Sequence, residues 1–234
     1  MTFKDKRALI TGGSDGIGLA TGKLLREKGC RVALMARNPE KLAAAAAEIG
    51  ALSIPGDVAR AEDARGAVER TVAEFGGIDI LVNNAGIGTW GPLVELDIAE
   101  FDRVFAVNVR GALLVTQAAA PHMIRHGSGN ILNIASTSGL KGSANGTIYC
   151  SSKFALRGMT ECWRDELRRH NIRVTLVNPS EVQTNFFVAN SLAPRPESPK
   201  KLRSQEIAAA IVGALEIDDR GFIPEFSVFA TNPF

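Results

Sequence analysis

Tyrosine is nearly missing from this chain, because Tyr149 is the single tyrosine among 234 residues. Cysteine and histidine are scarce as well, with 3 of each. The cysteines, Cys30, Cys150 and Cys162, are odd in number and have no metal-ligand spacing. The sequence therefore predicts neither a disulfide framework nor a metal site, and we expect a reducing, cytoplasmic compartment.

An excess of charge of one sign is absent too. The formal net charge is +2 and the basic residues are scattered, which argues against nucleic acid as a partner. The N-terminus carries Lys4, Lys6 and Arg7 but then enters a short apolar run and a glycine-rich loop. This pattern predicts neither a signal peptide nor a membrane span, so we expect no membrane partner.

Apolar runs and helical patterns alternate along the whole chain, and 45% of the residues are hydrophobic. The expected strands are 7–11, 31–36, 51–55, 78–82, 130–135, 173–177 and 221–228. The expected helices are 19–28, 40–49, 61–75, 101–126, 148–170 and 204–215. This alternation predicts an α/β fold, a Rossmann-type doubly wound parallel sheet with helices on both faces. We expect a single domain over residues 1–234, with a short, proline-containing substrate loop near 185–203.

Glycines stand where a first strand passes into a first helix. Gly12, Gly16 and Gly18 form a G-xxx-G-x-G pattern, a variant of the dinucleotide fingerprint. Residues without a Cβ let the backbone turn tightly and approach a pyrophosphate at the positive end of a helix. The alternative is an ordinary glycine-rich turn.

Arg37 closes the second strand, where a site that prefers NAD usually offers an acid to the ribose 2′-hydroxyl. A guanidinium suits a 2′-phosphate, so the sequence favours NADP(H). Asp15 in the glycine loop argues against NADP(H), because its negative charge would lie near the 2′-phosphate. NAD(H) is therefore kept as the alternative cofactor. Asp57, after the third strand, either accepts from an adenine amino group or caps a helix.

Tyr149 and Lys153 lie one helical turn apart and share a helix face. A lysine there favours the phenolate, and lowering the pKa of a tyrosine to about 7 takes roughly 4 kcal/mol. The pair would thus serve as a proton donor, unless it is a surface tyrosine packed along a lysine stem. Asn108 is an amide inside an apolar helix and needs a partner or a task.

These motifs arrive together as Thr11-Gly12-xxx-Gly16-x-Gly18, Asn83-Asn84-Ala85-Gly86, Asn108, Ser136, Tyr149-xxx-Lys153 and Asn178-Pro179. In this order and spacing the chain resembles a short-chain dehydrogenase/reductase over nearly its whole length. The resemblance implies seven parallel strands in the order 3-2-1-4-5-6-7. It also implies a homo-oligomer, a tetramer or a dimer, built on the two helices placed at Phe101 and Ile148.

The resemblance implies a catalytic set of Asn108, Ser136, Tyr149 and Lys153. Tyr149 would be the proton donor, Ser136 would donate to the substrate oxygen, Lys153 would hold the nicotinamide ribose, and Asn108 would anchor a water for proton replacement. The implied cofactor-binding residues are Gly12, Ser14, Asp15, Gly16, Ile17, Gly18, Arg37, Asp57, Val58, Asn84, Ala85, Gly86, Tyr149, Lys153, Pro179 and Thr184. Thr184 would touch the carboxamide. One departure is Ser180, which stands where the family usually has glycine after Pro179.

The candidate substrate residues are Trp90, Ser138 and Phe186, within the wider stretches 88–90, 140–145 and 186–187. An apolar pocket with an aromatic wall suits a ketone or a 3-oxoacyl chain, although core packing could also claim the phenylalanines. A basic group at two helix ends is either a rim for an acyl carrier protein or a solvated surface. That group comprises Arg125, His126, Arg168, Arg169 and His170.

We therefore predict an NADP(H)-dependent oxidoreductase that interconverts a ketone and a secondary alcohol, with Tyr149 as general acid/base. The alternatives are an NAD(H)-dependent alcohol dehydrogenase and a dinucleotide-binding redox sensor without chemistry.

Overall fold

Seven parallel strands form the central sheet of the protein, which we describe from a computed structural model covering residues 2–186, 190 and 198–232. The strands are β1 (Arg7–Thr11), β2 (Arg31–Ala36), β3 (Leu52–Pro55), β4 (Ile80–Asn83), β5 (Gly129–Ile134), β6 (Ile172–Pro179) and β9 (Glu225–Val228). Their order is β3-β2-β1-β4-β5-β6-β9. This confirms the predicted fold class and strand order, with β9 in the seventh place.

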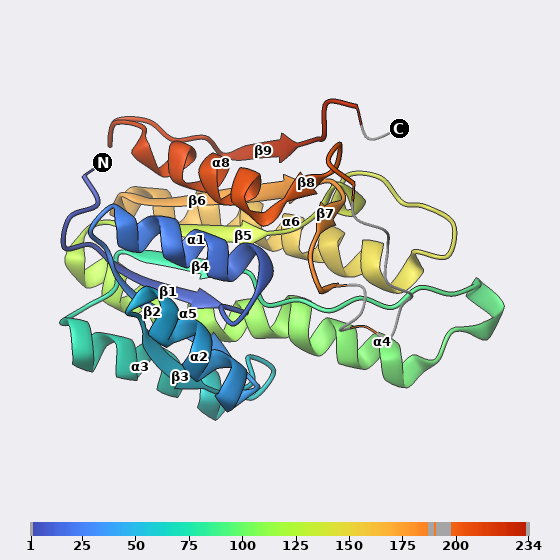
Figure 1. Cartoon of the computed structure of the whole chain (residues 1–234), viewed down its shortest axis with the longest axis horizontal. Helices are drawn as coiled ribbons and strands as arrows, with labels where there is room; N and C mark the ends of the chain where they lie inside the picture. The colour runs from blue at the N-terminus through green and yellow to red at the C-terminus, as the bar shows by residue number, and fades with distance from the viewer. Residues whose placement is uncertain (1, 187–189, 191–197, 233–234) are drawn as a thin grey trace.

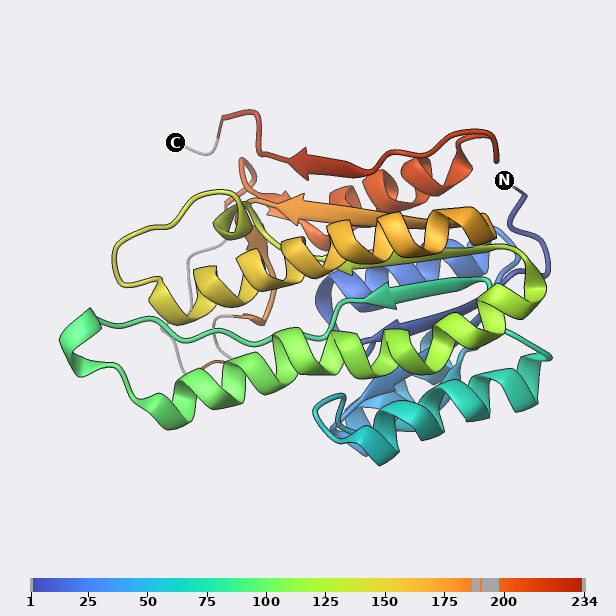
Figure 2. The same cartoon turned by 180° about the vertical axis from the view of Figure 1, so that it is seen from behind.

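Helices cover both faces of this sheet. Figure 1 shows α1 (Gly16–Glu27), α2 (Pro39–Ile49) and α8 (Ser204–Glu216) in front of it. The reverse view in Figure 2 shows α3 (Ala61–Phe75), α5 (Ala112–His126) and α6 (Thr147–Leu167) on the other face. One apolar cluster fills each interface, the first around Leu9 and Leu81 and the second around Ile10 and Val82. Neighbouring residues of one strand thus point to opposite faces, as a sheet buried on both sides requires.

Local signals set the ends of α2. The Asn38 side chain accepts a hydrogen bond from the backbone N–H of Lys41 at 2.9 Å, and Pro39 is the first helical residue. Gly50 ends the helix in the left-handed conformation, with φ 63°. Cap, proline and glycine together explain the bounds of this helix, which was expected at 40–49.

Two regions differ from the expected pattern. Helix α1 begins at Gly16 rather than residue 19, because the Asp15 side chain caps it by accepting from the Gly16 N–H at 2.7 Å. Two short strands, β7 (Val182–Gln183) and β8 (Leu202–Arg203), form a separate parallel pair around the segment expected to be loop. Strands of two residues are too short for an alternating pattern to reveal them.

The helix expected at 101–126 is continuous but not regular. It starts as α4 (Ile98–Phe105), passes through a π-helical turn at Ala106–Gly111 and continues as α5. By length and composition alone this run could cross a membrane, yet Val104, Val115 and Met123 are fully buried against the sheet. It is therefore placed as a core helix. The π turn contains Asn108 and was not predicted.

Candidate active site

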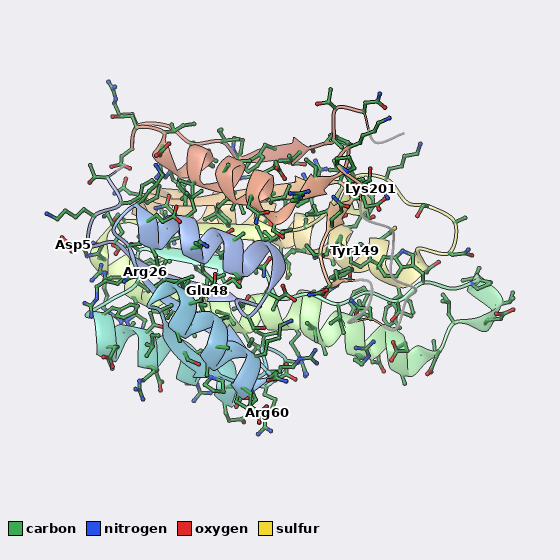
Figure 3. The ribbon with its side chains drawn as sticks, in the orientation of Figure 1. Asp5, Arg26, Glu48, Arg60, Tyr149 and Lys201 are labelled. Carbon is green, nitrogen blue, oxygen red and sulfur yellow. The ribbon has the colours of Figure 1, made fainter. Side chains whose placement is uncertain are left out.

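A cavity of about 940 Å³ opens at the carboxyl ends of the parallel strands. Ligands of open α/β sheets bind at this edge, next to the point where the strand order reverses between β1 and β4. In Figure 3 Tyr149 lies on the side toward which the strand arrows of Figure 1 point, and Asp5 lies on the opposite side. The predicted site residues that line the cavity are Gly12, Ser14, Asp15, Gly16, Ile17, Asn84, Ala85, Gly86, Trp90, Ser136, Ser138, Tyr149, Lys153, Pro179, Thr184 and Phe186.

The glycine loop makes a cradle with no room for side chains. Gly12 has φ 64° and Gly16 has φ 55°, conformations that glycine adopts without cost. A Cβ on Gly18 would lie 2.5 Å from the Gly12 carbonyl oxygen and from the Asn84 side chain. Helix α1 therefore starts in direct contact with the loop, and its first residues, Gly16 and Ile17, line the cavity where a pyrophosphate would bind.

Asn84 and Thr11 fix this loop to the end of β4. The Asn84 amide donates to the carbonyls of Thr11 and Gly12 at 2.9 and 3.1 Å. The Thr11 hydroxyl in turn accepts from the backbone N–H groups of Asn84 and Ala85, both at 3.0 Å. The cradle is thus held from a second strand and is preorganised.

The candidate catalytic pair lies in the first turns of α6. Tyr149 is 9% exposed and Lys153 is 4% exposed, so this is not a surface pair. The Lys153 ammonium donates to the Ile134 carbonyl at 3.0 Å and lies 5.6 Å from the centre of the Tyr149 ring. Ser136 lines the same cavity beside the Tyr149 phenol and acts on its pKa as a hydrogen-bonding neighbour. The structure therefore brings the serine that follows β5 next to the phenol and the ammonium of α6.

Asn108 lies behind this group rather than in the cavity lining. Its amide nitrogen donates to the Ile87 carbonyl at 2.8 Å and to the Ser152 hydroxyl at 3.0 Å, while its oxygen accepts from the Ile87 N–H at 2.9 Å. Ser152 donates to the Tyr149 carbonyl at 2.7 Å. The asparagine side chain thus ties the segment that follows β4 to the first turn of α6. Its π-helical position is a feature that often marks functional sites.

Comparison with known proteins shows which protein family this chain belongs to. The family model described as short chain dehydrogenase matches residues 6–194. An uncharacterised oxidoreductase of Staphylococcus aureus strain USA300 is 36% identical over 214 residues, which is 90% of this chain and 91% of the relative. The chain belongs to the short-chain dehydrogenase/reductase family. As a family member it is an NAD(P)-dependent oxidoreductase.

Solved structures agree with this assignment. A metagenomic short-chain oxidoreductase in complex with NADP has 34% identity and a TM-score of 0.85, covering 99% of this chain and 100% of that one. A 3-ketoacyl-(acyl-carrier-protein) reductase from Brucella melitensis, complexed with NADH, has 28% identity and a TM-score of 0.86, with 98% of each chain covered. A nicotinamide dinucleotide is thus the cofactor class of this fold, and the glycine cradle fits it.

Burial dominates the electrostatics of this dehydrogenase/reductase site. It raises the pKa of Tyr149 to about 12, although the hydrogen bond from Ser136 acts in the opposite direction. Burial also lowers the pKa of Lys153 to about 8. The protein's own groups, Lys153 included, therefore leave the phenol less acidic than a free tyrosine. A further positive charge is needed beside Tyr149.

Several predicted cofactor residues stand apart from the cavity lining. Among the described residues, Arg37 is exposed at the end of β2, and Asp57 accepts from the Ala59 N–H at 2.9 Å in the turn before α3. Val58 is buried, and a Cβ on Gly111 in the π turn would lie 2.7 Å from its side chain. Asp57 thus caps a turn that precedes Arg60, the N-cap residue of α3, rather than the helix itself.

Two residues that the sequence did not single out meet Asp15 at the cavity mouth. Lys41 on α2 places its ammonium 2.5 Å from the Asp15 carboxylate, and Asn185 donates to the same carboxylate at 2.7 Å. Desolvation opposes ionisation of Asp15, yet the hydrogen bonds from Lys41, Asn185 and Gly16 prevail and lower its pKa. Lys41 lies in the first turn of α2, four residues after Arg37, and this closeness in sequence is the signal that could have found it.

Other expectations resolve more simply. Ser180 does not adopt a positive φ, and its N–H donates to the Val228 carbonyl at 2.9 Å, so serine is tolerated there. Phe187 lies outside the described residues.

The two helix ends that carry the basic group are adjacent, since Asn171 donates to the Gly127 carbonyl at 3.2 Å. They lie where β5 and β6 begin, at the edge of the sheet opposite the cavity.

Proposed function

We propose that the chain interconverts a ketone and a secondary alcohol, with Tyr149 as the general acid/base. The observation that carries this proposal is that Ser136, Lys153 and the buried Tyr149 phenol line the same cavity as the glycine cradle, with the Lys153 ammonium 5.6 Å from the centre of the Tyr149 ring. A carbonyl placed there meets a donor and a proton source together.

The dinucleotide, when bound, supplies the hydride in the reductive direction and accepts it in the oxidative one. Ser136 donates a hydrogen bond to the carbonyl oxygen and holds it beside the phenol. Tyr149 gives its proton to that oxygen as the carbonyl becomes an alcohol, and Lys153 stabilises the resulting phenolate. A water anchored near Asn108 returns the proton.

The phenol must be acidified for this step. Moving its pKa from about 12 to near 7 corresponds to roughly 7 kcal/mol, more than a tyrosine of ordinary pKa would need. The positive charge of an oxidised nicotinamide acts in this direction, together with Lys153 and the N-terminus of α6. Cofactor binding and acid strength are therefore coupled in this proposal.

We propose NADP(H) as the preferred cofactor. Arg37 and Lys41 place two cations at the end of β2 and the start of α2, where a 2′-phosphate on the adenosine ribose would lie. Asp15 favours NAD(H) instead, because its carboxylate holds Lys41 and would repel a phosphate. An NAD(H)-dependent alcohol dehydrogenase is therefore the second candidate.

We also propose that residues 1–234 form one domain, and that the protein is a homo-oligomer in the cytoplasm. Leu113 and Ile124 on α5 and Phe154 on α6 are 41%, 36% and 43% exposed, which is apolar surface suited to contacts between copies. An acyl carrier protein is less supported as a partner. The basic group lies at the far edge of the sheet from Tyr149 of the same chain.

A substrate panel tests the proposal. Purified protein is assayed with NADPH and with NADH against ketones, 3-oxoacyl thioesters and secondary alcohols, and cofactor binding is measured separately. We expect turnover of at least one carbonyl compound, faster with NADPH. Tight cofactor binding without turnover of any substrate would instead assign the chain as a redox sensor.

A further inference from the structure

Three aromatic rings meet around the reacting phenol. The Trp90 ring lies 4.8 Å from the Tyr149 ring, at an interplanar angle of 39°. Phe186 lies 5.9 Å from Tyr149 and meets Trp90 edge-on at 6.3 Å. Both residues line the cavity, so two aromatic surfaces border the place where a carbonyl would bind.

The absence of a side chain at Gly88 leaves room for the Trp90 ring. A Cβ on Gly88 would lie 2.4 Å from the Trp90 ring and 3.1 Å from the Tyr149 ring. Gly88 does not have a positive φ, so glycine is needed here for space rather than for backbone conformation. The indole occupies the volume that any other residue at position 88 would fill.

The loop that carries Trp90 is fixed from α4. The Thr89 hydroxyl donates to the Glu100 carboxylate at 2.7 Å, and Arg103 donates to both oxygens of that carboxylate at 2.8 and 2.7 Å. Hydrogen bonds from Arg103 and Thr89 lower the pKa of Glu100 to about 2, so the contact persists at neutral pH. Trp90 is thus held in place before a substrate arrives.

Backbone contacts hold the same loop from two other sides. The Gly91 N–H donates to the Asn145 carbonyl at 2.9 Å, and the Gly88 N–H donates to the Asn190 side chain at 2.9 Å. Asn190 also donates to the Phe186 carbonyl at 2.6 Å. One asparagine therefore sets the spacing between the two aromatic walls.

Charge is scarce at this end of the cavity. Of the charged residues among the described lining, Asp15 and Lys41 pair with each other at the glycine loop, Glu181 pairs with Lys201 at 2.8 Å, and Lys153 is buried under Tyr149. Beside Trp90 and Phe186 this lining is neutral, with hydroxyl, amide and alanine side chains from residues 136–138 and 144–145. Among the described residues, a carboxylate or phosphate on the substrate would meet no cation beside Trp90 and Phe186.

We propose that the substrate is a neutral ketone with a flat ring next to its carbonyl, either an aryl ketone or a conjugated cyclic ketone. The ring lies against Trp90 and Phe186 while its oxygen faces Ser136 and Tyr149. Each aromatic pair contributes about 0.5–1.5 kcal/mol beyond area burial, so two pairs favour a flat ring by about tenfold over a saturated one. This inference rests on the ketone reduction proposed above and adds the substrate class.

A matched pair of substrates tests it: an aryl methyl ketone and the cyclohexyl methyl ketone with the same carbon count. We expect wild-type kcat/KM to favour the aryl ketone about tenfold. Trp90→Leu should bring the ratio below about threefold, while Trp90→Phe keeps most of it. Phe229→Leu, at a side chain 63% exposed, is the control and should leave the ratio unchanged. A wild-type ratio near one, or tenfold faster turnover of a 3-oxoacyl thioester, would overturn the inference.

Binding separates this inference from the proposed reaction. In a Trp163→Phe background Trp90 is the remaining tryptophan, and its fluorescence in the presence of NADP⁺ reports ring binding. Quenching by the aryl ketone alone, without turnover of any ketone, would support ring recognition and remove the proposed reaction. Turnover without ring preference would support the reaction and overturn the ring inference. No binding of the aryl ketone, together with no turnover of any ketone, would overturn both.

Discussion

Replacing Lys153 with methionine should stabilise the protein measured without cofactor. Burial lowers the pKa of this lysine from 10.5 to about 8, which at pH 7 corresponds to a cost of roughly 3 kcal/mol for keeping the ammonium inside. Methionine has a similar length and no charge, and it gives up the hydrogen bond to the Ile134 carbonyl, about 1 kcal/mol. The expected net gain is about 2 kcal/mol in the free energy of unfolding.

The pH dependence of this gain has a definite sign. Because the folded pKa of Lys153 is lowered, the unfolded state binds more protons between pH 8 and pH 10.5. Wild-type stability therefore rises with pH across that window relative to the methionine variant. The difference in the free energy of unfolding between the methionine variant and wild type should therefore shrink by about 2 kcal/mol between pH 7 and about pH 9.5.

Urea unfolding of both proteins at the two pH values measures this directly. Lys23→Met is the control, since the Lys23 side chain is 57% exposed and its replacement should change stability by less than about 0.5 kcal/mol. If Lys153→Met were less stable than wild type at pH 7, the buried ammonium would have to be stabilised by more than the contacts described above. The reasoning about its cost would then be refuted.

Three further predictions concern the cofactor, the phenol and the fold. Arg37→Asp and Lys41→Gln should each lower the ratio of kcat/KM for NADPH to that for NADH by about tenfold, and an unchanged ratio in both would place the 2′-phosphate elsewhere. Tyrosinate absorbance of the sole tyrosine should titrate near pH 12 without cofactor and well below 10 with NADP⁺, and a midpoint near 10 with NADP⁺ would contradict an activated phenol. Asp79→Asn should cost about 3 kcal/mol in urea unfolding, because it leaves Arg7 without its 2.7 Å partner, and a cost like that of the exposed Asp218→Asn would show that the pair contributes little.

Elements with strong local signals were predictable from sequence. Helix α3 matches its expected bounds, and α2 differs by one residue at its proline. The glycine loop, the serine and the tyrosine–lysine pair were also found, since each depends on residue type and spacing within a short stretch. Their meeting in one cavity follows from parallel strands ending at the same edge of a sheet.

Contacts between distant segments were not predictable in this way. Asp15 meets Lys41 and Asn185, which are 26 and 170 residues away, through side-chain contacts that no local pattern encodes. The π turn around Asn108 mixes apolar and polar residues, as the regular helix on either side does, so no local pattern marks it. Burial of Tyr149 also escaped prediction, although it moves the pKa of the phenol away from the value that catalysis needs.

The central claim is that Tyr149 supplies the proton in a dinucleotide-dependent reduction of a ketone. The most direct measurement compares wild type with Tyr149→Phe, using NADPH and a ketone that wild type reduces. We predict that kcat/KM falls by about 10²–10⁴-fold while the Kd for NADPH stays within about twofold. Retention of a tenth of the wild-type activity by the phenylalanine variant would contradict the claim.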